Sequence, residues 1–132
     1  MSDLASRGED FAAFWTERHL CTLSTVRRDG TPHVTPVGAT VDLDSGLARV
    51  ICSRTSQKAR NVLRAGADGA PVSLCQVEGR RWSALEGRAV VRDDAESVAD
   101  AERRYAQRYR TPRENPRRVV VEIRVARVLG TV

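Results

Sequence analysis

Residues 20–52 read LCTLSTVRRDGTPHVTPVGATVDLDSGLARVIC. Runs rich in Val, Leu and Thr alternate with two short polar turns, one at Asp29 and Gly30 and the other over residues 42–46. Such turns join neighbouring strands into antiparallel hairpins. The pattern predicts strands over residues 20–26, 33–41 and 47–52. Pro36 interrupts the second strand, and because proline has no amide hydrogen to donate, we expect an edge or a bulge there.

The segments on either side add short helices and further strands. Ser6 and Glu9 have the spacing of a capping box, and Phe11, Phe14 and Trp15 then share one helical face. Further helices are predicted over residues 56–64 and from a cap at Asp93 and Glu96 to about residue 109, and further strands over residues 71–77, 81–92 and 118–129. Six strands with about three helices argue against a doubly wound parallel sheet. They favour a mainly β (α+β), six-stranded antiparallel barrel in a single domain, residues 1–132.

Composition excludes several classes of protein. Of 132 residues, 41% are hydrophobic and 30% are charged, which is typical of a folded globular chain. No apolar run approaches the roughly 20 residues that a membrane span needs, and residues 1–10 lack the apolar stretch of a secretion signal. The odd set of Cys21, Cys52 and Cys75, without CxxC spacing, argues against a disulfide framework or a zinc site. We expect three reduced thiols in a cytoplasmic protein that has no membrane partner.

Positive charge is concentrated in the last quarter of the chain. Residues 101–132 contain nine Arg against three Glu, whereas the first 100 residues are nearly neutral. Such a segment is either a solvated face or a binding site for an anion, such as nucleic acid, an acidic lipid surface or a small polyanion. Nucleic acid is disfavoured because Tyr105 and Tyr109 are the only aromatic residues nearby. No helix-turn-helix or zinc-finger motif occurs either.

The usual catalytic motifs are absent from the sequence. It contains no G-x-S-x-G, no H-E-x-x-H and no glycine-rich phosphate loop. His19 and His33 are the only histidines, which is too few for a metal site, and neither has the pattern of a nucleophile with its base. We therefore predict no metal and assign no catalytic side chain.

One segment has the composition of a phosphate site. Residues 49–61 read RVICSRTSQKARN, a strand, a short polar loop and the start of a helix. The first amides of a helix are unsatisfied and attract anions, and hydroxyl and basic side chains surround them here. An ordinary helix cap with solvated charges is the alternative. Lys58 favours the phosphate site, because it is the only lysine among 22 basic residues and lies in this helical turn.

Short motifs along nearly the whole chain resemble one protein family. They are residues 23–26 (LSTV), 29–34 (DGTPHV), 49–51 (RVI), 56–61 (SQKARN) and 81–89 (RWSALEGRA). In this order and spacing they resemble the flavin- and deazaflavin-binding split β-barrel proteins related to pyridoxamine 5′-phosphate oxidase. Within that family, residues 105–113 (YAQRYRTPR) and 115–119 (NPRRV) are similar to the branch of actinobacterial reductases that use coenzyme F420.

The resemblance implies a homodimer with F420 in a groove at the subunit interface. It places the cofactor phosphate near Lys58 and the helix start at Ser56, with Gln57 and Asn61 in the same pocket. The implied contacts of the ring are Thr35, Pro36, Val37, Gly38 and Trp82. The cofactor carries a phosphodiester and an oligoglutamate tail, so the basic C-terminal segment suits it. Arg108, Arg110 and Arg113 are the expected substrate contacts.

The implied reaction is hydride transfer from reduced F420 to a conjugated small molecule. The substrate is expected to be a tetrapyrrole, with biliverdin reduced to bilirubin, and the proton is expected to come from water polarised by an arginine. The lack of a catalytic constellation fits this chemistry, because the cofactor supplies the hydride. Two alternatives remain open: an FMN-dependent oxidase of the pyridoxamine-phosphate-oxidase type, and a non-catalytic protein that binds F420 or a tetrapyrrole.

Overall fold

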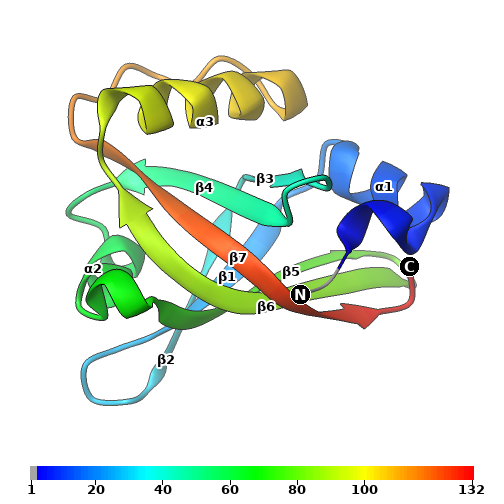
Figure 1. The fold of residues 1–132 in the computed structure, drawn as a ribbon, viewed down its shortest axis with the longest axis horizontal. Coiled ribbons are helices and arrows are strands. Elements are labelled where there is room, and N and C mark those ends of the chain that lie inside the picture. The colour runs from blue at the N-terminus through cyan, green and yellow to red at the C-terminus, as the bar shows by residue number, and fades with distance from the viewer. Residues whose placement is uncertain (1–2) are drawn as a thin grey trace.

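Strands form the framework of the computed structural model, which describes residues 3–132 (Figure 1). The strands are β1 (Cys21–Val26), β2 (Pro32–Val37), β3 (Ala39–Asp42), β4 (Leu47–Ser53), β5 (Ala70–Glu78), β6 (Arg81–Arg92) and β7 (Arg118–Gly130). The helices are α1 (Glu9–Thr16), α2 (Gln57–Leu63) and α3 (Ala95–Arg108), with short 3-10 turns at Leu4–Arg7 and Gly66–Asp68. Residues 1 and 2, which belong to the expected domain and to the N-terminal segment 1–10, lie outside the described residues.

The strands build one antiparallel sheet that curls into a split barrel. Its order is β2-β1-β5-β6-β7-β4-β3, so β2 and β3 are the two edges of the sheet. Gly38 is the single residue between those two edge strands, and the sheet must therefore curl until its edges meet there. This confirms the expected mainly β barrel with three helices.

The number of strands is seven rather than the expected six. The run predicted as one strand over residues 33–41 changes its partner at Gly38, where pairing with β1 ends and pairing with β4 begins. Pro36 lies in an edge strand, as expected for a residue without an amide hydrogen. No turn motif marks the change of partner, because Gly38 alone separates the two strands and no turn forms there.

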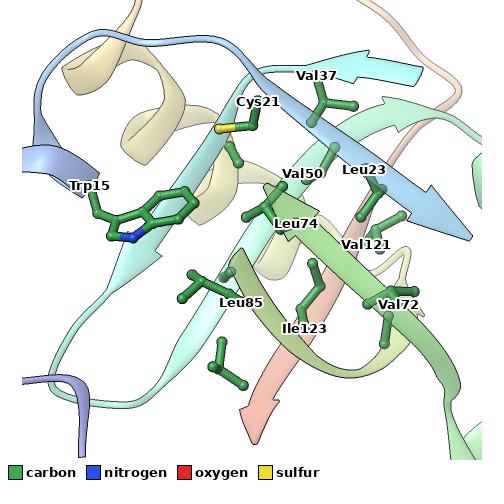
Figure 2. Close-up of a cluster of buried hydrophobic side chains, with 14 of the residues drawn as sticks. Trp15, Cys21, Leu23, Val37, Val50, Val72, Leu74, Leu85, Val121 and Ile123 are labelled. Atoms are coloured by element: carbon green, nitrogen blue, oxygen red, sulfur yellow. The ribbon is translucent and has the colours of Figure 1, made fainter. Parts of the chain in front are cut away.

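Apolar side chains on the inner face of the sheet form the core (Figure 2). Alternate residues of each strand point inward, and Leu23 of β1 and Leu74 of β5 are completely buried. From α1, Phe14 and Trp15 join the same cluster, and Trp15 Nε1 donates a hydrogen bond to Ser83 Oγ at 3.1 Å. Each large apolar side chain buried in this way contributes roughly 1.5–3 kcal/mol to stability.

The first and third helices begin differently from the prediction. The capping box of Ser6 and Glu9 is wrong, because Gly8, at a φ of 102°, is the residue before α1 and no side chain caps this helix. The Ser6 hydroxyl instead donates to the carbonyl oxygen of Asp3 at 3.0 Å. α3 is capped by Asp94, one residue beyond the predicted cap, through a bond from the amide three residues later.

Ion pairs attach α3 to the outer face of the sheet, above β4 and β7 (Figure 1). Only two residues of this helix are buried, so apolar packing is slight. Asp100 lies 3.9 Å from Arg49 of β4, and Glu102 lies 2.7 Å from Arg118 of β7. Charged groups therefore determine how α3 and the segment after it sit over the barrel.

Candidate functional site

A cavity of about 690 Å³ opens where the junction of β2 and β3 meets β4, α2, α3 and the segment after α3. We call it the cationic cavity. Its lining residues are Pro36, Val37, Gly38, Ile51, Lys58, Tyr105, Arg110, Thr111, Pro112, Arg113 and Arg118. They come from parts of the chain up to 82 positions apart, from Pro36 to Arg118, which the curl of the sheet brings together.

Four cations and no carboxylate line this cavity among the described residues. Within residues 3–132, Lys58, Arg110 and Arg113 form no ion pair, so their charges are uncompensated. Arg118 pairs with Glu102 through Nη1, but its buried Nε has no hydrogen-bond partner. A buried donor without an acceptor costs free energy, which an incoming anion would recover. The arrangement is therefore suited to an anionic ligand.

One wall of the cavity is apolar and closely packed. A Cβ atom at Gly38 would come within 2.8 Å of Tyr105 Cε2 and 3.2 Å of Tyr109 Cε2, so glycine lets both rings approach the backbone. The Tyr109 hydroxyl donates to the carbonyl oxygen of His19 at 2.6 Å and accepts from the amide of Ala39 at 3.1 Å. These contacts fix the end of α3 against the junction of β2 and β3. A planar ring with an anionic arm would match this wall and the neighbouring cations.

Arg108 lies inside the protein, apart from Arg110 and Arg113. Its guanidinium donates to the carbonyl oxygen of Glu17 at 2.8 Å, to that of Ala39 at 2.6 Å and to Gln76 Oε1 at 2.7 Å. It is 9% exposed and does not line the cationic cavity. The geometry gives it the role of a structural clamp between α3, α1 and the sheet.

Of the residues expected around the start of α2, only Lys58 reaches the cationic cavity. Ser56 caps the helix, accepting from the Ala59 amide at 3.4 Å and donating to a backbone carbonyl. Asn61 is buried, donates to Thr25 Oγ1 at 2.9 Å and accepts from Gln57 at 2.8 Å. Since α2 has only seven residues and its cap is already occupied, side-chain cations rather than helix amides define this site.

Two further expected contacts lie outside the lining of this cavity. Thr35 is half-buried beside Pro36, on the inner side of β2. Trp82 lies at the hairpin between β5 and β6, opposite Val77, and is 38% exposed. Sequence reasoning assigned no role to Ile51, Tyr105, Thr111, Pro112 and Arg118, which do line the cavity. All five fall in the motifs that carried the resemblance, which is the signal that could have found them.

The model of the pyridoxamine 5′-phosphate oxidase family matches residues 8–131. The chain belongs to this family. A curated relative, the F420H(2)-dependent biliverdin reductase of Mycobacterium tuberculosis (strain CDC 1551 / Oshkosh), is 54% identical over 123 residues. That alignment covers 93% of this chain and 87% of the relative.

Solved structures support the same fold. A structure described as an F420 reductase has a TM-score of 0.73 at 22% identity, covering 92% of this chain and 98% of the other. A conserved hypothetical protein from Mycobacterium tuberculosis has a TM-score of 0.78 at 25% identity, covering 98% and 87%. The family expected from the motifs is therefore confirmed.

Two kinds of feature are absent from the described residues. In the part of the chain that the structure describes, no group of three or more His, Cys, Asp or Glu side chains is placed to hold a metal ion. No helix among residues 3–132 is long and apolar enough to cross a bilayer.

Proposed function

We propose that this member of the pyridoxamine 5′-phosphate oxidase family is an F420H2-dependent biliverdin reductase. The observation that carries the proposal is the 54% identity, over 93% of the chain, to the mycobacterial enzyme of that name. The cationic cavity supports it independently, because both the cofactor and biliverdin are anions. We place the reaction in the cytoplasm, where the three free cysteines of the protein would remain reduced.

The residues of the cationic cavity fit the cofactor. Lys58 and the orphaned Nε of Arg118 would hold the phosphodiester. Pro36, Gly38 and Tyr105 would bound the flat ring on its apolar side. When bound, reduced F420 supplies the hydride, so the chain has only to bind, orient and exclude water.

Arg110 and Arg113 would recognise the two propionates of biliverdin. Both follow α3 on the rim of the cavity, and their charges are uncompensated within residues 3–132. A guanidinium binds a carboxylate through two parallel hydrogen bonds, which fixes orientation as well as position. Because a guanidinium does not give up its proton in proteins, we assign proton delivery to water that these arginines bind.

We also propose that the protein is a homodimer. The outward side chains of β2, β1 and β5 are all uncharged, although 30% of the sequence is charged. This uncharged face consists of Pro32, Val34, Pro36, Thr22, Ser24, Val26, Pro71, Ser73, Cys75 and Val77. Val34 and Val77 are 59% and 66% exposed. Pro36 belongs to both the face and the cationic cavity, so a second copy on this face would complete the cavity wall.

A turnover assay tests the proposed function. Purified protein is given reduced F420 and biliverdin, and oxidation of the cofactor is followed together with bilirubin formation. We expect both products in equal amounts, and no reaction when NADPH or reduced FMN replaces reduced F420. Faster turnover with FMN would favour the oxidase alternative. Tight binding of F420 and biliverdin without any turnover would favour the non-catalytic binding protein.

A further inference from the structure

Arg118 lies between two hollows of the surface. It lines the cationic cavity, and it also lines a groove of about 810 Å³ between α3 and the segment that follows this helix. Glu102 of α3 lines the groove and not the cavity. The Arg118 side chain is only 10% exposed, so its guanidinium forms part of the wall between the two hollows.

Glu102 occupies one corner of the Arg118 guanidinium. Its Oε2 accepts a hydrogen bond from Nη1 at 2.7 Å, which is the one side-chain hydrogen bond of Arg118 within residues 3–132. Nε is buried without a partner, and Nη2 makes no hydrogen bond to the described residues. The ion pair therefore leaves the edge formed by Nε and Nη2 free.

This free edge is the one that suits an oxyanion. The N–H bonds of Nε and Nη2 along the edge point in the same direction, and they can donate two parallel hydrogen bonds to the oxygens of a phosphate or a carboxylate. A carboxylate of the protein on this edge would block it. Glu102 instead meets the guanidinium at Nη1, from the groove, so the edge stays available to a ligand.

The charge of Glu102 also suits this arrangement. Lys58, Arg110 and Arg113 line the same cavity as Arg118, and no carboxylate lines it among the described residues. Like charges repel one another, and more strongly where little water screens them. The Glu102 carboxylate offsets this repulsion from outside the cavity, without occupying the space of an anionic ligand.

The fold holds both partners of this ion pair in place. Asp100 lies 3.9 Å from Arg49 and so attaches α3 to β4 (Figure 1). Arg118 is the first residue of β7 and pairs with Ser53 of β4, and its amide donates to the carbonyl oxygen of Asn115 at 3.1 Å. With both backbones fixed, the ion pair determines the direction in which the guanidinium points.

We propose that Glu102 is a positioning residue for cofactor binding, because it holds the Arg118 guanidinium with its free edge open to the phosphodiester. This inference rests on the proposed function, which puts the phosphodiester of F420 at Lys58 and Arg118. Glu102 itself touches no ligand and acts through Arg118. Removing a carboxylate makes the cavity more positive, which by charge alone would tighten the binding of an anion. Loss of the positioned edge has the opposite effect and weakens it.

Calorimetric titration with F420 tests this role in variants of α3. E102A removes the charge and the hydrogen bond, whereas E102Q removes the charge and keeps an oxygen that can accept from Nη1. The charge control is E96A, since Glu96 is an exposed residue of the same helix in no ion pair of the described residues. The attachment control is D100N, which weakens the ion pairs that hold α3 without touching Arg118.

We expect E102A to bind F420 about 3- to 10-fold more weakly than the wild type does. E102Q, E96A and D100N should bind it within about twofold of the wild type. In an R118Q background E102A should cause no further loss, because Glu102 then has no guanidinium to position.

An E102A variant that binds F420 as tightly as the wild type, or more tightly, would overturn the positioning role and leave the proposed function standing. An equal loss in D100N would also overturn it, because Glu102 would then act only by attaching α3. So would a loss from E102A that is the same with and without R118Q. Failure of the wild type to bind F420 would overturn both the positioning role and the proposed function.

Discussion

At the scale of single residues, the cationic cavity depends on charges that have no partner in the protein. Lys58 is half-buried, and its ammonium forms no ion pair within residues 3–132. Its positive charge therefore adds little to folding and remains available to a ligand. A side chain of this kind can be removed with a large effect on binding and a small effect on stability.

Lys58→Ala should weaken binding of F420 strongly. Loss of a charge-assisted contact to the phosphate costs about 1.5–3 kcal/mol, or roughly a 10- to 150-fold increase in Kd. The free energy of unfolding should change by less than about 0.5 kcal/mol. Calorimetric titration with F420 and urea unfolding measure the two effects, with Arg18→Gln as a distant control. Unchanged affinity in Lys58→Ala would contradict the phosphate site.

Arg108 and Arg110, two positions apart, should give opposite phenotypes. Arg108→Ala removes hydrogen bonds to the carbonyl oxygens of Glu17 and Ala39 and to Gln76 Oε1, the last two of them buried, and we expect stability to fall by about 2 kcal/mol or more. Arg110→Ala should leave stability unchanged and raise the KM for biliverdin. Urea unfolding and steady-state kinetics separate the two roles. Similar stability losses in both variants would contradict a structural role for Arg108 and a substrate-binding role for Arg110.

At the scale of elements, α3 depends on ionised carboxylates. The Arg104 hydrogen bond holds the pKa of Asp100 below its usual value, and the nearby charges of Arg49 and Arg103 act in the same direction. A carboxyl whose pKa is lower in the folded protein stabilises it fully above the unfolded pKa. That contribution is lost as the pH falls through the folded pKa.

Asp100→Asn should therefore destabilise the protein at neutral pH and matter less in acid. For a partly exposed set of ion pairs we expect about 0.5–1 kcal/mol at pH 7. The difference from wild type should shrink as the pH falls below the unfolded value of about 3.9. Urea unfolding at a series of pH values measures this, with Asp68→Asn, an exposed carboxyl in no ion pair of the described residues, as the control. A difference that is independent of pH would contradict the assignment.

The limits of the strands could be predicted from the sequence, whereas the pairing of the strands and the burial of single charged residues could not. Turn motifs such as Asp29-Gly30 gave strand limits close to those observed, because local chemistry determines where a hairpin turns. The division at Gly38 was missed, since it reflects a change of pairing partner and leaves no local signal. Lys58, singled out by its type and place, lines the cationic cavity, whereas the burial of Arg108 was not predicted. An arginine in the last turn of a helix is equally compatible with solvent and with the carbonyl oxygens of other elements.

At the scale of the whole molecule, the uncharged face and the cationic cavity meet at Pro36. Covering this face with a second copy would remove exposed valines from water and place that copy next to the cavity at Pro36. The site would then depend both on the fold of one chain and on the association of two chains.

Val34→Asp, which places a charge in the middle of the uncharged face, should convert the proposed dimer to a monomer. Light scattering after size-exclusion chromatography measures the mass, and cofactor affinity should fall in parallel. Ala13→Asp, which adds the same charge to an exposed position of α1, should remain dimeric. A wild type that is monomeric with and without F420 would contradict the proposed assembly.

The most direct measurement is a crystal structure of the wild-type protein grown with F420. We expect the phosphodiester within about 4 Å of Lys58 Nζ and the Arg118 guanidinium, with the ring against Gly38 and Tyr105. A phosphodiester at any other place, or a cofactor bound away from the junction of β2 and β3, would contradict the proposed site.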